Sequence, residues 1–262
     1  MGKSLDDHGG TSPRTAKDKG KGLGNGARDE ALTMERPSGS TNAELRRSSM
    51  VRILSAASKL FIERGFDSAP IDAIAAEAGL TKGAVYFYFK GKANLLAALL
   101  ERAEADTVGA IEAALEESRD SGSTTDELVA FLRAQSMVGQ EYPDSMLLLM
   151  LTSVEFHGRG GPLEARLDRI FARMTSLLED VISRGQVDGT ITRNTASKDI
   201  ATVVMAVNQG AFLEWHRNRE SLRGPDLARA LRRMVLHGIL SPETTENRHL
   251  QERERRSGEA GR

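Results

Sequence analysis

Apolar residues recur at intervals of three and four along most of this chain, from residue 46 to residue 240. The clearest early example is a set on one face of a helix: Ile53, Leu54, Ala57, Leu60 and Phe61. The sequence lacks both the two-residue alternation of a half-buried strand and any repeat at the period of a solenoid. The period therefore predicts an all-α fold.

Glycine, proline and capping residues divide this stretch into about nine helices. Gly65, Gly79 and Gly185 are expected to end the helices before them, because glycine accepts the left-handed backbone found at helix C-termini. Thr81 is expected to cap the helix that follows it. The predicted helices are one that ends at Gly65, then residues 71–78, 81–88, 92–117, 124–140, 143–156, 162–184, 196–217 and 225–240.

The two ends of the chain differ in composition from this helical stretch. Residues 1–45 include eight glycines and no Ile, Val, Phe, Trp or Tyr, too little apolar surface to offset the entropy of ordering. Residues 241–262 carry mixed charges and no apolar face. We therefore expect disordered tails over 1–45 and 241–262.

The sequence offers no group of residues that would support catalysis or metal binding. The absence of cysteine excludes disulfides, thiolate metal sites and cysteine nucleophiles. His157 and His216 each stand two residues from a glutamate, a spacing that places the two side chains on opposite sides of a helix. A Gly-rich phosphate loop and a nucleophile elbow are also missing. We therefore expect that the protein is not an enzyme and that it binds neither a metal nor a cofactor.

Hydropathy argues against a membrane protein. The longest strongly apolar run, Met146–Leu151, is far shorter than the roughly 20 residues of a membrane-spanning helix. The first residues lack the apolar centre of a secretory signal. These features predict a cytoplasmic protein.

Charge is distributed unevenly along the chain, although its net value is only -1. Residues 46–92 carry eight basic and four acidic side chains, whereas residues 93–262 carry 21 basic and 26 acidic ones. A basic segment on an acidic body is typical of a nucleic-acid binder, although solvated helix faces produce similar runs.

The turn between the second and third predicted helices has the residues of a helix-turn-helix. The small side chains of Ala75 and Ala78 allow the two helices to approach closely. Gly79 is expected to take the left-handed conformation that ends the first of them. Leu80 and Val85 would fix the angle between them from the core side.

The stretches Ile53–Asp67 and Ile71–Leu96 closely resemble the DNA-binding domain of the TetR family of bacterial repressors. The segment Gly185-Gln-Val-Asp-Gly-Thr-Ile, with the two long apolar helices after it, is loosely similar to the ligand-sensing half of the AcrR-like branch. The resemblance implies a three-helix DNA-binding domain over residues 46–91 and a helical effector-binding and dimerisation domain over residues 92–240.

The same resemblance implies a transcriptional repressor that binds a palindromic operator in double-stranded DNA as a homodimer. A small-molecule effector would release it by favouring a state whose two recognition helices are wrongly spaced for successive major grooves. Regulation by a protein partner in place of a small molecule, or action as an activator, fits the same residues.

The first turn of the third helix is where such a motif meets base edges. Lys82 could reach a guanine or a phosphate, Gly83 permits close backbone approach, and Ala84 could touch a thymine methyl group. Thr81, as the cap, belongs to the same group. The arginines that precede this module, Arg46 and Arg47 with Arg52, are expected to contact phosphates or the minor groove.

The resemblance also assigns roles to the aromatic run after this turn. It implies that Tyr86 binds phosphate, that Tyr88 faces the groove and that Lys92 contacts phosphate. Phe87 and Phe89 are expected to pack.

Two positions depart from the family pattern. Pro70 stands where a capping Thr or Ser is usual, so a cap and a phosphate contact are expected to be missing or supplied by Ser68. Asp72 brings a negative charge towards DNA, where it either accepts from cytosine or repels phosphate.

Within the second domain, large apolar residues are candidates to line a cavity for a hydrophobic or aromatic effector, although each could equally be plain core. They are Met146, Met150, Phe156, Phe171, Met174 and Phe212.

The last two predicted helices are candidates for the dimer interface, because the first of them is apolar on more than one face. The family arrangement would pair them with the partner's matching helices in a four-helix bundle about a two-fold axis. The candidate residues are Ile200, Val203, Val204, Val207, Ala211, Leu227, Leu231, Met234 and Val235.

Overall fold

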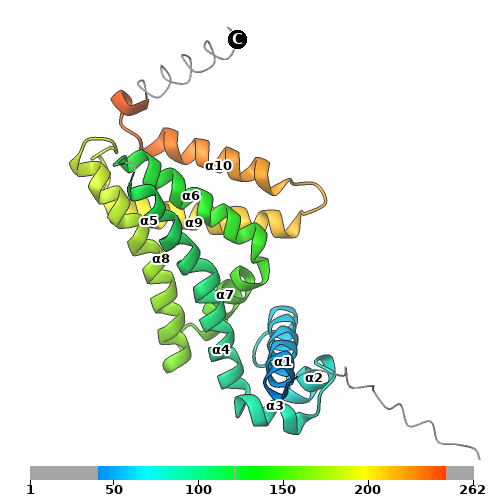
Figure 1. The fold of residues 1–262 in the computed structure, drawn as a ribbon. Helices are drawn as coiled ribbons and strands as arrows, with labels where there is room; N and C mark the ends of the chain where they lie inside the picture. Colours follow the sequence, from blue (N-terminus) through cyan, green and yellow to red (C-terminus); the bar gives the residue numbers. More distant parts are fainter. Residues whose placement is uncertain (1–40, 121, 246–262) are drawn as a thin grey trace, which may run out of the picture. The chain divides into compact units, whose positions relative to one another are not determined.

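The computed structural model describes residues 41–120 and 122–245. Within these residues the chain forms ten α-helices and one π-helix, and its only β-pairing is an isolated bridge between Ile191 and Leu240 (Figure 1). The all-α prediction is confirmed. The elements are α1 (Asn42–Arg64), α2 (Ile71–Glu77), α3 (Lys82–Phe89), α4 (Lys92–Glu104), η1 (Ala105–Gly109), α5 (Ala110–Arg119), α6 (Thr124–Glu141), α7 (Pro143–Phe156), α8 (Pro162–Val187), α9 (Ser197–Arg217) and α10 (Gly224–Ile239).

Helices α1, α2 and α3 pack around fully buried apolar side chains, among them Ile53, Phe61, Ile74 and Val85. Helix α4 contacts α1 and α3 and also packs against α7 and α8 (Figure 1). One helix therefore belongs to both the helix-turn-helix and the helical body. Within the body, α8 packs against α6 and α9, and α10 packs against the same two helices.

The first helix begins earlier than the predicted domain boundary at residue 46. Thr41 and Glu44 form a capping box, in which the Thr41 hydroxyl accepts from the Glu44 N–H (3.3 Å) and the Glu44 carboxylate accepts from the Thr41 N–H (2.6 Å). Residues 42–45, expected to be disordered, are thus helical, and the T-x-x-E pattern was the signal for it. The rest of that predicted tail, residues 1–40, lies outside the described residues.

The predicted C-terminal tail also starts with structure. Residues 242–245 form a helical turn, in which the Ser241 hydroxyl accepts from the Thr244 N–H (3.3 Å). Residues 246–262 lie outside the described part of the chain.

The long helix predicted over residues 92–117 is interrupted by the π-helix η1. Its buried residues Ala103, Thr107, Ile111 and Leu115 are spaced by four throughout. In an unbroken α-helix three such steps would rotate the stripe by about 120° away from the core. The wider turn of η1 absorbs one residue and keeps the stripe facing inward, which is why ten helices are seen rather than about nine.

Gly185 does not end α8, which continues to Val187. A Cβ at Gly185 would lie 2.6 Å from Ile191 Cδ1 and 2.9 Å from Thr124 Cγ2. The glycine is therefore required by close packing, and the predicted stop at this position is wrong. Among the described residues, no helix combines the length and the apolar character needed to cross a membrane.

Candidate nucleic-acid interface

The turn between α2 and α3 has the predicted geometry. Gly79 adopts a left-handed conformation (φ 61°), and its carbonyl accepts from Arg52 Nη2 at 3.1 Å. A Cβ at this position would lie 2.6 Å from the same Arg52 nitrogen. Arg52, expected near phosphate, is thus placed by α1 to brace the turn.

Thr81 caps α3, since its hydroxyl accepts from the Ala84 N–H at 3.2 Å. Val85 and Phe89 are buried on the inner face of this short helix. Ala84 is half-buried, and Thr81 is exposed. The exposed residues of α3 and its C-cap recur at helical spacing and define its outer face: Lys82, Gly83, Tyr86, Phe87 and Lys90.

The aromatic run divides differently from the expectation. Tyr86 is 46% exposed, and Phe89 is buried as expected. Phe87, expected to pack, is 69% exposed, because it lies two residues from both Val85 and Phe89 and therefore points away from the core. Tyr88 is half-buried beside the core, with its ring centroid 5.1 Å from that of Phe87. The sequence could have predicted that Phe87 is exposed, because Val85 and Phe89 face the core and Phe87 lies between them.

Asp72 meets a partner within the protein. Lys82 Nζ lies 3.0 Å from Asp72 Oδ2, so the carboxylate of α2 is paired with the first residue of α3. The hydrogen bond and charge of Asp72 raise the pKa of Lys82. Asp72 uses one of the three ammonium hydrogens of Lys82. Pro70, at the N-cap of α2, makes no side-chain cap hydrogen bond, as expected.

Lys92 is engaged within the protein as well. Its Nζ donates to the carbonyls of Phe66 (2.7 Å) and Asp67 (3.0 Å) and lies 4.6 Å from the centre of the Phe66 ring. These contacts tie the start of α4 to the loop between α1 and α2. The two carbonyls use two of its three ammonium hydrogens.

The same loop is held from the other side by α7. Glu155 accepts from the N–H groups of Phe66 (2.8 Å) and Asp67 (3.0 Å). Arg159 pairs with Asp67 at 2.9 Å and lies 3.6 Å from Glu155. We call Lys92, Glu155 and Arg159 the loop clamp: Lys92 and Glu155 bind all four backbone polar groups of Phe66 and Asp67, and Arg159 pairs with the Asp67 side chain.

No local pattern in the sequence pointed to the clamp. Glu155 is 88 residues from Asp67 in sequence, and only the tertiary fold brings them together. The clamp joins the DNA-binding helices to two helices of the body.

Arg46 and Arg47 lie on the exposed second turn of α1. They are on a different helix from the outer face of α3.

The six candidate effector residues do not gather around one cavity. Met146 and Phe212 belong to a small cluster against which Met150 packs, whereas Phe156 and Met174 are buried in the main core and Phe171 packs on it. A cavity of about 40 Å³ between α6, α9 and α10 is lined by only one of the six, Phe212. That volume holds a few water molecules and is too small for a drug-sized ligand.

The nine candidate dimer residues fall into three classes. Ile200, Val204 and Leu231 are buried in the chain's own core, because they face neighbouring helices of the body. Ala211, Leu227 and Val235 are half-buried. The exposed members are Val203 (61%), Val207 (49%) and Met234 (74%).

The exposed members continue into small residues at the same helical spacing. We call this set the α9–α10 stripe: Val203, Ala206, Val207, Gly210, Ala230, Met234 and Gly238. On α9 the sequence pattern could not separate this outward stripe from the inward one, since that helix is apolar on two faces.

Comparison with known proteins agrees with this geometry. Residues 53–99 match the model of the family described as bacterial regulatory proteins, tetR family. The MbdR regulator from Azoarcus sp. CIB is 38% identical, with a TM-score of 0.66, over 72% of this chain and 98% of that one. The repressor BepR of Brucella suis biovar 1 is 23% identical over 165 residues, which cover 62% of this chain and 78% of BepR.

A solved complex of SmeT with triclosan has the same fold, with a TM-score of 0.60 and 20% identity over 75% of this chain and 94% of that one. The match to MbdR extends through the body as well as the helix-turn-helix. The chain therefore belongs to the TetR family of helix-turn-helix transcriptional regulators.

Proposed function

We propose that this protein is a cytoplasmic repressor that binds a palindromic operator as a homodimer and is released by a small-molecule effector. The observation that carries the proposal is the outer face of α3, where basic and aromatic side chains surround a glycine on a capped, exposed helix. Such a helix fits the major groove.

The proposed DNA contacts divide by position. Lys82, Gly83 and Ala84 meet base edges at the start of α3, with Thr81 holding the helix N-terminus. Tyr86 donates its hydroxyl to phosphate, and Lys90 adds a second exposed charge at the other end of the helix.

The remaining candidates lie around this face. Phe87 offers an apolar surface for a thymine methyl group, and Tyr88 supports it from the side. Arg46, Arg47 and the free hydrogen of Lys92 contact phosphates outside the groove.

The α9–α10 stripe is the proposed dimer interface. Its apolar side chains are exposed in the single chain, and its glycines and alanines allow helices to approach closely. A symmetric pairing of this stripe would bury it and place two copies of α3 against successive half-sites.

The proposed effector acts in the body. The complex of SmeT with triclosan supports the idea that this fold accepts an aromatic molecule. Binding among Met146, Phe212 and their neighbours requires the small cavity to open, so the bound state would differ from the one described. The second candidate is a regulator that responds to a protein partner, or one that activates transcription. A footprint on DNA that small molecules do not change would favour this second candidate.

Selection of duplexes from a random pool, followed by footprinting, tests the proposal. We expect an enriched inverted repeat protected on both half-sites. The double variant Lys82→Ala, Tyr86→Phe should bind this repeat more weakly. If it enriches the same repeat and binds it with the affinity of the wild type, the outer face of α3 is not the DNA-binding face.

A further inference from the structure

An open groove lies beside the π-helix in the body. It has a volume of about 780 Å³ and runs between α8 on one side and α4, η1 and α5 on the other. That volume lies in the range of small-molecule sites. Its space comes from small residues on both sides, and the π-helix forms part of the wall: Ala105, Gly109, Ala172 and Ser176.

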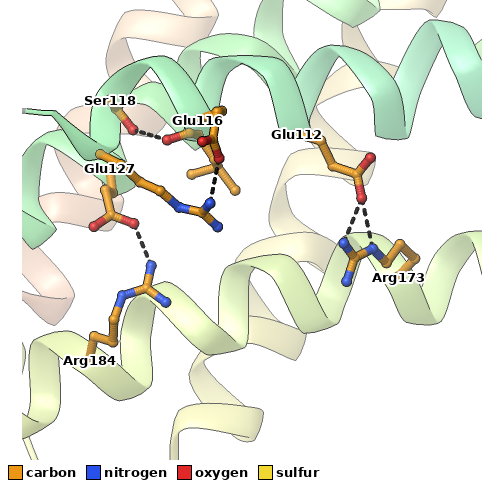
Figure 2. Close-up of polar contacts among 8 residues, drawn as sticks. Glu112, Glu116, Ser118, Glu127, Arg173 and Arg184 are labelled. Atoms are coloured by element: carbon orange, nitrogen blue, oxygen red, sulfur yellow. Dashed lines mark hydrogen bonds and ion pairs between the residues drawn. The ribbon is translucent and has the colours of Figure 1, made fainter.

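Two ion pairs join the walls of the groove. Arg166 Nη2 lies 2.9 Å from Glu104 Oε2, and Arg173 donates from Nε (2.9 Å) and Nη2 (2.6 Å) to Glu112 Oε1. Figure 2 shows the second of these pairs, with α8 facing the helix that carries Glu112. A further pair beyond the groove, Arg184 with Glu127, continues along α8.

The π-helix sets the register of the two pairs that join the walls. Arg166 and Arg173 are seven residues apart, so they lie on one line of α8, whereas Glu104 and Glu112 are eight apart. In an unbroken α-helix Glu112 would be rotated by about 80° from that line. Because η1 absorbs one residue between them, both carboxylates face α8.

Arg169 lies between Arg166 and Arg173 on α8 and lines the groove. Its side chain forms no hydrogen bond or ion pair with any described residue. Arg166 Nε is buried and also lacks a hydrogen-bond partner among the described residues. An N–H in that position costs free energy that an arriving acceptor would recover.

Donors therefore outnumber acceptors in the groove. Each guanidinium has five N–H groups, and the pairs to Glu104 Oε2 and Glu112 Oε1 use only some of those of Arg166 and Arg173. Glu101 is the remaining acid in the lining. Three arginines with unused, fork-shaped donors favour an oxygen anion over a cation or a neutral polar group.

We infer that this groove binds a small amphipathic anion. Its carboxylate or phosphate lies on Arg169 and on the unused N–H groups of Arg166 and Arg173, and its apolar part lies against Val108 and Ala172. The inference rests on the proposed function and deepens it: it names the chemical class of the effector and places the effector in this groove, not among Met146, Phe212 and their neighbours.

The groove is also connected to the DNA-binding helices. The helix that forms one of its walls begins at Lys92, a member of the loop clamp. A ligand that draws α8 and η1 together would move α4 and, through Lys92, the loop between α1 and α2. The clamp transmits the binding event to α3.

The first experiment measures binding by the full chain of four probes with the same eight-carbon tail: octanoate, octyl phosphate, octanol and octylammonium. We expect calorimetry to show that at least one of the two anions binds about tenfold or more tighter than octanol and octylammonium. Comparison of octanoate with octyl phosphate shows which head group is preferred. The inference is overturned if neither anion binds, or if octanol or octylammonium binds as tightly.

Arg169→Gln is the matching variant, because Arg169 has no recorded contact to lose. It should weaken anion binding by about tenfold or more. Arg133→Gln is its control, since Arg133 is exposed on α6 outside the groove and should leave binding unchanged. Equal anion binding by wild type and Arg169→Gln would overturn the inference.

Measurements of operator binding distinguish a failure of the groove inference from a failure of the proposed repressor function. If the wild-type chain selects an operator that the preferred anion releases, Arg169→Gln should keep operator affinity and lose release. Release that persists in Arg169→Gln overturns the groove but leaves the repressor intact. A chain that binds no duplex specifically refutes the proposed function, whereas anion binding that depends on Arg169 would still support the groove.

Discussion

Lys92 ties the start of α4 to the loop between α1 and α2. The resemblance put it at the start of α4 beside DNA, and the structure describes it at the start of that helix. Its two contacts to the Phe66 and Asp67 carbonyls depend on a loop 25 residues earlier in sequence, which no local pattern reports. The contacts of Glu155 with the same loop also depend on residues that are distant in sequence.

We expect Lys92→Ala to destabilise the fold as well as weaken operator binding. The variant removes the Lys92 ammonium from two carbonyls and leaves that of Asp67 without its side-chain donor, which lowers the free energy of unfolding by about 1–2 kcal/mol. Urea denaturation measures this loss. Lys90→Ala, at an exposed position, is the control and should change stability by less than about 0.5 kcal/mol.

Lys90 offers a second test at this scale, because it has a left-handed conformation (φ 53°) that costs an L-residue energy. Lys90→Gly should raise the free energy of unfolding by about 1 kcal/mol. If Lys90 binds phosphate, the same variant should reduce the salt slope of operator binding by about one unit. A stabilised variant with an unchanged slope would remove Lys90 from the interface.

At the scale of helices, the sequence predicted most boundaries, because caps, glycines and the apolar period act locally. Thr81 and Gly79 behave as their residue types require. The π-helix was missed because apolar residues spaced by four, from Ala103 to Leu115, also fit an α-helix. Only the rotation that accumulates over three such steps shows that an unbroken α-helix would turn this stripe away from the core. The stop at Gly185 was wrong because close packing by Ile191 selects glycine just as a helix end does.

The two glycines of the helix-turn-helix provide a matched pair at this scale. Gly79→Ala should cost about 1–3 kcal/mol of stability, because φ is 61° and Arg52 leaves no room for a Cβ. Gly83 has a helical backbone, and a Cβ there would meet Thr81 Oγ1 at 3.8 Å, an ordinary contact distance, so Gly83→Ala should stabilise α3 by about 0.5–1 kcal/mol. We expect Gly83→Ala nevertheless to weaken operator binding, because the added methyl group lies on the face proposed to approach bases. Thermal melts and gel shifts on both variants check the pair.

At the scale of the whole molecule, the sequence identified the helices of the proposed interface but not which of their faces is exposed. Val204 is buried in the chain's own core, so a charge there would disrupt folding rather than test association. Val203 and Met234 are exposed and lie on the α9–α10 stripe. They are therefore the informative positions.

We expect Val203→Glu combined with Met234→Glu to give a helical monomer that loses operator binding, since like charges would meet across a two-fold axis. Analytical ultracentrifugation measures the change in mass, and circular dichroism confirms the helical content. Val154→Glu, at an equally exposed valine on α7, should remain dimeric. A dimer that survives the double change would move the interface elsewhere.

The central claim is that the outer face of α3 reads an operator, and sequence selection with purified protein tests it most directly. Wild-type protein should enrich duplexes with an inverted repeat whose half-sites lie about one helical turn, or a multiple of it, apart. Lys82→Ala should enrich a repeat that differs at the bases next to the start of α3. Enrichment of the same bases by wild type and Lys82→Ala, or of no repeat by either, would contradict the account.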